Sequence, residues 1–207
     1  MKQVIITLPQ IKEGETQLVN SLFMNGEIER LHLRKPKATA LEMEEWIKQI
    51  ETAYRDRIVL HDCHDLSLRY GLGGVHLNGR NPEAPSWVGK VQAQRPFTVS
   101  RSCHSIAEVE HYAPLCDYVF LSPIFDSISK EGYGAAFSRQ QLAEARHLGI
   151  IRPNVYALGG VSYDNLEEVR SLGFGGYAML GAFWNRVLVS TVVTPLTPPL
   201  GESGLVH

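Results

Sequence analysis

Short apolar segments alternate with amphipathic segments along almost the whole chain. Each apolar segment has about five residues, flanked by turn residues, which is typical of a buried β-strand. Eight such strands are predicted. They are Val4–Leu8, Arg30–Arg34, Arg57–Leu60, Gly74–Leu77, Phe97–Ser100, Tyr118–Leu121, Val155–Leu158 and Gly176–Leu180.

The segments between these strands have the period of helices. Thr39 is a predicted N-cap with Glu42 three residues later, which is the pattern of a capping box. Seven helices or helical turns are predicted in all. They are Glu15–Asn25, a helix that follows Thr39, Leu66–Tyr70, Trp87–Gln92, Ile106–Tyr112, Ser138–Leu148 and Tyr163–Leu172.

Strands that alternate with helices form parallel sheets with right-handed crossovers. An open doubly wound sheet could hold the same elements, but no Gly-rich GxGxxG follows the first strand, and eight short strands favour closure. We therefore predict a single compact (β/α)8 TIM barrel over residues 1–187. Prolines at 195, 198 and 199 and a β-branched run predict an irregular tail over residues 188–207 in place of a long final helix.

The composition is that of an ordinary globular protein. The 207 residues carry 20 Lys and Arg against 22 Asp and Glu, so the net charge of −2 gives no reason to expect a nucleic-acid partner. No apolar run is long enough for a membrane span or a signal peptide. The three cysteines form no paired framework, which favours reduced thiols and a cytoplasmic location.

Polar residues gather where the predicted strands end, and a barrel builds its active site from those ends. Cationic groups outnumber anionic ones there, so we expect an anion such as phosphate to bind. Gly159 and Gly160 end the seventh strand, and Gly181 ends the eighth. Loops after these two strands often cradle a phosphate, although turn glycines needed only for positive φ would look the same.

Four ordered motifs over about residues 28 to 184 resemble the thiamine phosphate synthase and thiazole tautomerase family of barrels. They are LHLRKPK, LHDCHDLSLRYGLGGVHLN, SCHSIAEVEHYAPLCDYVFLSPIFDSISK and VYALGGVSYDNLEEVRSLGFGGYAMLGAF. A synthase of this family joins hydroxymethylpyrimidine diphosphate to thiazole phosphate and releases pyrophosphate. The resemblance therefore implies phosphorylated small-molecule substrates and a Mg²⁺ cofactor.

The resemblance also implies roles for individual residues. Arg34 and Lys130 fall on the residues that hold the diphosphate, and Ser102 falls on a serine that helps to hold the substrate. Asp62 falls on a magnesium aspartate, and Asn81 falls on a second one. Further substrate contacts are expected from His32, Lys35, His61, His104, Gly159, Gly160 and Gly181.

Several positions depart from the synthase pattern. His32 replaces a glutamine and His61 an asparagine, Gly181 replaces a phosphate-binding serine, and the neutral Asn81 is a weaker ligand for Mg²⁺ than a carboxylate. Some departures resemble the tautomerase branch, which works without metal. The acid–base histidine of that branch falls on Pro123, so His104 or His61 would have to move the proton.

Two further alternatives remain open from the sequence. The substituted positions would also suit a barrel that binds thiamine phosphate or its precursors without turnover. A zinc ion could be held by His61, His64, His76 and His104 with Cys63 or Asp62, although strand alternation and the absence of a helical i, i+4 pair count against it. A homodimer is compatible with such a barrel.

Overall fold

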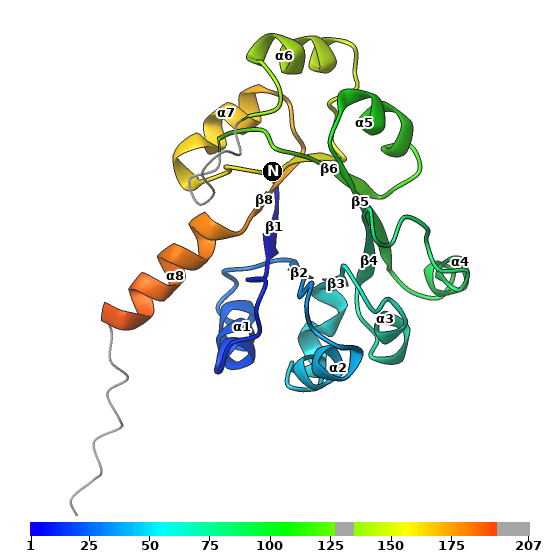
Figure 1. The fold of residues 1–207 in the computed structure, drawn as a ribbon, viewed down its shortest axis with the longest axis vertical. Helices are drawn as coiled ribbons and strands as arrows, with labels where there is room; N and C mark the ends of the chain where they lie inside the picture. The colour runs from blue at the N-terminus through cyan, green and yellow to red at the C-terminus, as the bar shows by residue number, and fades with distance from the viewer. Residues whose placement is uncertain (127–134, 194–207) are drawn as a thin grey trace, which may run out of the picture.

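The computed structural model, which describes residues 1–126 and 135–193, contains a closed barrel of eight parallel strands in the order of the sequence. Figure 1 shows the strands meeting at the centre with the helices arranged around them. The strands are β1 (Lys2–Ile6), β2 (Leu31–Leu33), β3 (Ile58–Leu60), β4 (Gly74–Leu77), β5 (Thr98–Cys103), β6 (Tyr118–Leu121), β7 (Val155–Ala157) and β8 (Gly176–Met179). The predicted barrel is confirmed.

Helices follow the strands as the periodicity predicted. They are α1 (Glu15–Met24), α2 (Ala40–Lys48), α3 (Asp65–Arg69), α4 (Val88–Gln92), α5 (Ile106–Tyr112), α6 (Arg139–His147), α7 (Leu166–Ser171) and α8 (Gly181–Val193), with 3-10 turns at Thr52–Arg57 and Tyr163–Asn165. The capping box at Thr39 forms, because the Thr39 side chain accepts from the Glu42 N–H while the Glu42 carboxylate accepts from the Thr39 N–H.

Side chains along each strand alternate between the layer beneath the helices and the inside of the barrel. In β2, Leu31 and Leu33 belong to the large apolar layer between strands and helices, while His32 between them points to the barrel axis. Inside the barrel, Val4, Ile6 and Ala178 of β1 and β8 pack with Tyr118 and Phe120 of β6. The half of the barrel formed by β2 to β5 is filled by polar side chains instead, and this half leads to the candidate site.

The end of the chain differs from the expectation. Helix α8 runs to Val193, so the prediction that an irregular segment begins at residue 188 is wrong for residues 188–193. A β-branched residue costs a helix only about 0.5 kcal/mol, and the restriction that a proline places on the residue before it first applies at Thr194. Residues 194–207 lie outside the described part of the chain.

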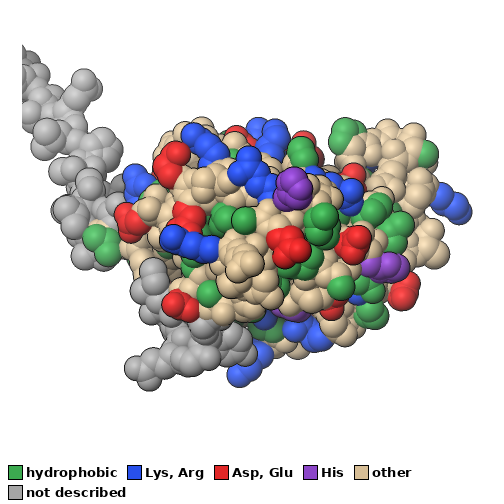
Figure 2. Space-filling model, turned by 90° about the horizontal axis from the view of Figure 1, so that it is seen from above, with side chains coloured by type: hydrophobic (Ala, Val, Ile, Leu, Met, Phe, Trp, Pro, Cys, Tyr) green, Lys and Arg blue, Asp and Glu red, His purple; other side chains and the backbone are tan. Residues whose placement is uncertain are grey.

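The surface agrees with the near-neutral charge of the sequence. Acidic and basic side chains are interspersed over the face drawn in Figure 2. In the part of the chain that the structure describes, no helix is long and apolar enough to cross a membrane.

Candidate active site

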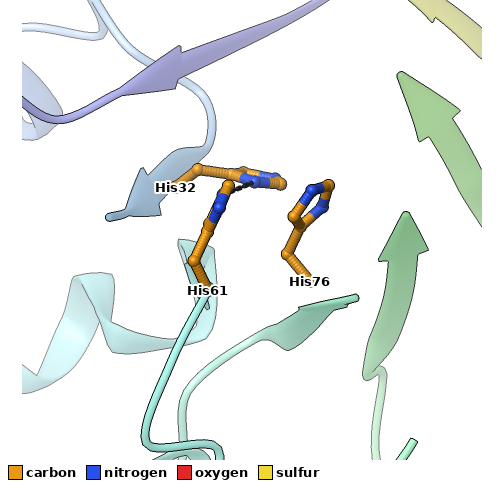
Figure 3. A group of neighbouring side chains, drawn as sticks. All are labelled: His32, His61 and His76. Atoms are coloured by element: carbon orange, nitrogen blue, oxygen red, sulfur yellow. Dashed lines mark hydrogen bonds between the residues drawn. The ribbon is translucent and has the colours of Figure 1, made fainter. Parts of the chain in front are cut away.

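Three histidines from successive strands converge inside the barrel (Figure 3). The rings of His61 and His76 stack with their centroids 4.1 Å apart, and His32 meets both rings edge-on. His32 and His76 are fully buried and His61 is 4% exposed. Among the described residues, these three form the group of His, Cys, Asp or Glu side chains close enough to share a metal ion, with ligand atoms within 4.8 Å of one another.

Hydrogen bonds within the protein already occupy most of these ring nitrogens. His32 bonds through Nδ1 to His61 Nε2 at 2.9 Å and through Nε2 to the Tyr118 hydroxyl at 2.6 Å. His76 bonds to the Ser100 hydroxyl at 2.9 Å and to the Ser102 hydroxyl at 2.8 Å. The trio therefore holds together without an ion, and His64 and His104 of the zinc alternative are not part of it.

The three imidazoles are neutral at physiological pH. Burial lowers the pKa of His76 to about 3, with further lowering from His64, Arg101 and Arg34. Burial, reinforced by the neighbouring histidines, lowers the pKa of His32 and of His61 well below the ordinary value of 6.5. Each ring can thus both donate and accept, which a chain of hydrogen bonds requires.

This arrangement makes the folded state sensitive to acid. Below pH 6.5 the unfolded chain binds a proton at His76 while the folded chain does not until about pH 3, so stability falls as pH is lowered across this interval. Each such histidine contributes about 1 kcal/mol per pH unit. We expect urea unfolding between pH 7 and pH 4.5 to show this slope, and His76→Gln to reduce it. A His76→Gln protein with the wild-type slope would contradict this assignment.

The strand register shows that His32 lies deeper than His61 below the mouth of the barrel, the end formed by the carboxyl ends of the strands. His32 lies opposite Val59, two residues before His61, so His61 stands nearer to the mouth. The prediction that His32 contacts substrate is wrong, because both of its ring nitrogens are bonded inside the barrel. The hydrogen bond with His32 fixes the orientation of the His61 ring, and contact of His61 with substrate stays a prediction.

Charged residues surround the mouth beyond these rings. Arg34 follows β2 and is half-buried, and its peptide is fixed by the Thr7 hydroxyl of the neighbouring strand segment. Burial and the nearby Arg80 guanidinium lower the pKa of Arg34, whereas Asp62 raises it. Arg34, Asp62 and Arg80 therefore form one electrostatic group, and Arg80 was not among the predicted site residues.

The two residues expected to hold Mg²⁺ lie together but do not fit that ion. Asp62 accepts hydrogen bonds from Arg80 Nε and Nη2 at 3.2 and 2.9 Å, and from Asn81 Nδ2 at 2.9 Å. Mg²⁺ binds oxygen ligands, usually one or two carboxylates together with substrate phosphates. Here the one carboxylate is bonded to a cation and to an amide N–H, so its oxygens are already engaged without a metal ion.

The turn after β7 is shaped for a close approach of the loop after β6. Gly159 and Gly160 have φ of 89° and 65°. A Cβ on Gly159 would lie 2.7 Å from Pro123 Cα, and one on Gly160 would lie 2.5 Å from the Asp126 carbonyl oxygen. Gly159 and Gly160 therefore have the positive φ that the turn-glycine interpretation expects, whereas Gly181 does not. Phosphate binding by the same turn stays a prediction.

We expect Gly160→Ala to lower the free energy of unfolding by at least about 2 kcal/mol, because strain at positive φ adds to the clash with the loop. Gly71 offers a matched control, since its φ is 67° but no atom lies within 4 Å of the Cβ position. Gly71→Ala should cost about 1 kcal/mol from strain alone. Equal losses measured by urea unfolding would contradict a role for the loop contact.

The structure contradicts the prediction for Lys35. It was expected to bind substrate, but it is 1% exposed and its Nζ donates to both carboxylate oxygens of Glu15 at 2.6 and 2.7 Å and to the carbonyls of Leu8 and Gln10. The indole N–H of Trp46 donates to the same carboxylate at 3.0 Å. Because Arg34 points into the mouth, the next residue of the chain points outward, toward α1 and α2.

The other predicted site residues lie at different places around the barrel. Ser102 stands at the mouth on β5 and holds His76, while His104 is exposed with its Nδ1 3.2 Å from the Ser122 carbonyl oxygen. Gly181 begins α8 directly after β8, the strand next to β7. Lys130 lies outside the described residues.

Three contributors were missed from the sequence. Tyr118 and Ser100 occupy inward positions of β6 and β5, and strand alternation could have identified them as partners of the histidines. Arg80 lies in the loop after β4, in which Asn81 was the predicted site residue. No local pattern signals the Glu15 contact with Lys35, because the two residues are 20 positions apart.

The closed parallel barrel with a polar mouth defines the protein as a (β/α)8-barrel protein with its candidate site at the carboxyl ends of the strands. The sequence pattern of the thiamine monophosphate synthase family matches residues 4–183. The chain belongs to this family and is an enzyme of the transferase class.

Individual relatives agree with this assignment. The chain is 29% identical over 165 residues to the thiamine-phosphate synthase of Listeria monocytogenes, covering 79% of this chain and 74% of the relative. It is 28% identical over 159 residues to that of Pediococcus pentosaceus, covering 74% and 70%. The solved thiamine phosphate pyrophosphorylase of Bacteroides thetaiotaomicron is 35% identical and superposes with a TM-score of 0.76, covering 98% of this chain and 90% of that one.

Proposed function

We propose that this enzyme joins hydroxymethylpyrimidine diphosphate to thiazole phosphate, giving thiamine phosphate and pyrophosphate. The observation that carries the proposal is the placement of Arg34 and the Gly159–Gly160 turn at the same end of one closed barrel. That placement provides a cation for a diphosphate and a side-chain-free turn for a second phosphate. The family and the named relatives support this pairing of substrates.

The chemical task is to stabilise charge that develops on the departing pyrophosphate. In this proposal the Arg34 guanidinium donates to the diphosphate oxygens, and its position is fixed by the hydrogen bonds between its peptide and the Thr7 hydroxyl. The Ser102 hydroxyl, which is bonded to His76, is placed to assist at the same end. A rigid cation near the leaving group favours the transition state more than the ground state.

The second phosphate is assigned to the neighbouring ends of β7 and β8. Gly159 and Gly160 keep this turn free of side chains, and α8 begins at Gly181 on the adjacent strand. The partial positive charge at the start of a 13-residue helix favours a phosphate there. Gly181 lacks the hydroxyl of the family serine, so backbone N–H groups carry this contact.

The direct test is to incubate the purified protein with both substrates and follow pyrophosphate release together with thiamine phosphate formation. We expect both products in equal amounts, and neither when one substrate is omitted. Pyrophosphate release without thiamine phosphate would indicate hydrolysis rather than condensation. Binding of thiamine phosphate without turnover would favour the non-catalytic alternative.

A second candidate activity is isomerisation of a thiazole carboxylate phosphate. The observation that favours it is the hydrogen-bonded chain from Tyr118 through His32 to His61, which provides a route for a proton toward the mouth. Conversion of that substrate without the pyrimidine partner, and its loss in His61→Asn, would select this activity. The diphosphate role of Lys130, the homodimer and the cytoplasmic location stay predictions.

A further inference from the structure

An arginine occupies the place where the family pattern puts a magnesium ion. Arg80 contacts the Asp62 carboxylate through Nε at 3.2 Å and Nη2 at 2.9 Å, in a two-pronged arrangement. The Arg80 side chain is 51% exposed and that of Asp62 is 20% exposed. The guanidinium can therefore exchange its partner without opening the fold.

The loop after β4 is built to present Arg80 at this point. The Asn78 side-chain oxygen accepts from the N–H groups of Arg80 and Asn81, and the peptides of Asn78 and Asn81 bond to each other in both directions. The Asn78 and Asn81 amides both donate to the His61 carbonyl, which ties the loop to the end of β3. Asn81 contributes an N–H to Asp62, so this neutral residue supports the ion pair rather than a metal ion.

The charges at the mouth favour an anionic ligand. The Asp62 carboxylate is paired with Arg80. The Arg34 guanidinium lies near enough to both groups for their charges to act on its pKa, although it makes no ion pair of its own with Asp62 among the described residues. The three side chains together carry a net charge of +1. A planar guanidinium matches two phosphate oxygens at once and remains charged at any physiological pH. Asp62 keeps the Asn81 hydrogen bond when Arg80 turns to another anion.

We propose that Arg34 and Arg80 together hold the pyrophosphate group of the substrate in place of a magnesium ion, with Asp62 as the partner of Arg80 in the free enzyme. The inference rests on the proposed function and gives it a definite consequence, namely that the enzyme works without a divalent cation.

The first test measures inorganic pyrophosphate binding by isothermal titration calorimetry in EDTA and, separately, in MgCl2. The wild-type protein is expected to bind pyrophosphate in EDTA, and Arg80→Gln to bind it about tenfold or more weakly, the loss of one charge-assisted contact. Arg80→Lys should fall between the two. The matched control is Arg170→Gln, because Arg170 is also exposed and paired with a carboxylate, Glu167, at 3.4 Å, and it lies in the last turn of α7. The pyrophosphate affinity of this control variant should match that of the wild type.

The second test asks whether Arg80 takes the place of the metal ion. The double variant Arg80→Gln with Asn81→Asp restores two carboxylates and removes the cation, so its pyrophosphate binding should depend on Mg²⁺. Wild-type binding that requires Mg²⁺, or unchanged affinity in Arg80→Gln, would overturn the inference. Thiamine phosphate formation in EDTA and in MgCl2 separates the two claims. Turnover only with Mg²⁺ refutes the inference alone, whereas metal-free binding without turnover in either buffer refutes the proposed function alone.

Discussion

An Arg34→Ala enzyme is expected to release pyrophosphate about 100-fold or more slowly than the wild type. Arg34 provides a half-buried cation at the mouth, and its backbone is fixed by Thr7, so little reorganisation is needed when charge develops on the leaving group. Removal of one fixed donor to such a charge costs 100- to 1000-fold as an order of magnitude. The measurement is the steady-state rate of pyrophosphate release, with kcat and KM determined separately.

The same strand provides the control for this experiment. Arg30 precedes β2 at the opposite end of the barrel, where its Nη1 donates to the Thr98 hydroxyl at 2.8 Å. Arg30→Ala should therefore retain the wild-type kcat. Arg34→Lys keeps the charge but loses the two-pronged geometry, so its rate should lie between those of Arg34→Ala and the wild type. An Arg34→Ala rate within twofold of the wild type would remove this residue from the mechanism.

Replacing Lys35 is expected to unfold the protein more readily without any direct effect on chemistry. Lys35→Met leaves the Glu15 carboxylate buried without its cation, and breaking a buried pair in this way costs about 3–5 kcal/mol. For a chain of this size that corresponds to a decrease in Tm of roughly 10 °C. Urea unfolding at pH 7 would measure the loss of stability.

Two further variants identify the cause. Lys37→Met changes an exposed lysine two positions along the same motif and should alter stability by less than about 0.5 kcal/mol. Adding Glu15→Gln to Lys35→Met removes the unpaired charge while keeping an acceptor for the Trp46 indole, so most of the stability should return. A Lys35→Met protein as stable as the wild type would show that the buried pair contributes little.

The structure explains two departures from the synthase pattern as one change. His32 stands where the family has a glutamine and His61 where it has an asparagine, and the two side chains bond to each other at 2.9 Å. Tyr118 completes the chain on the far side of His32. Because each neutral imidazole needs a partner for both nitrogens, replacement of one member would have left the other with an unsatisfied buried group.

Local signals in the sequence were sufficient for the architecture. The predicted strands Gly74–Leu77 and Tyr118–Leu121 have the observed bounds, and the Thr39 cap was identified from its capping-box pattern. These features depend on neighbours in the chain, through side-chain alternation and the backbone N–H groups that a helix leaves open. The extent of α8 was not predicted, because the weak preference of β-branched residues against helices does not stop a helix.

The sequence by itself determined the barrel, its family and the end of the barrel at which the candidate site lies. Only the tertiary structure decided what each polar residue at that end does. Arg34 and Lys35 are adjacent and alike in sequence, yet alternation sends one to the mouth and the other to Glu15 and Trp46 behind the strands. The sequence predicts Asp62 as a metal ligand, whereas in the structure its carboxylate is paired with Arg80, 18 positions away. Such roles depend on partners that are distant in the chain, and no local pattern records them.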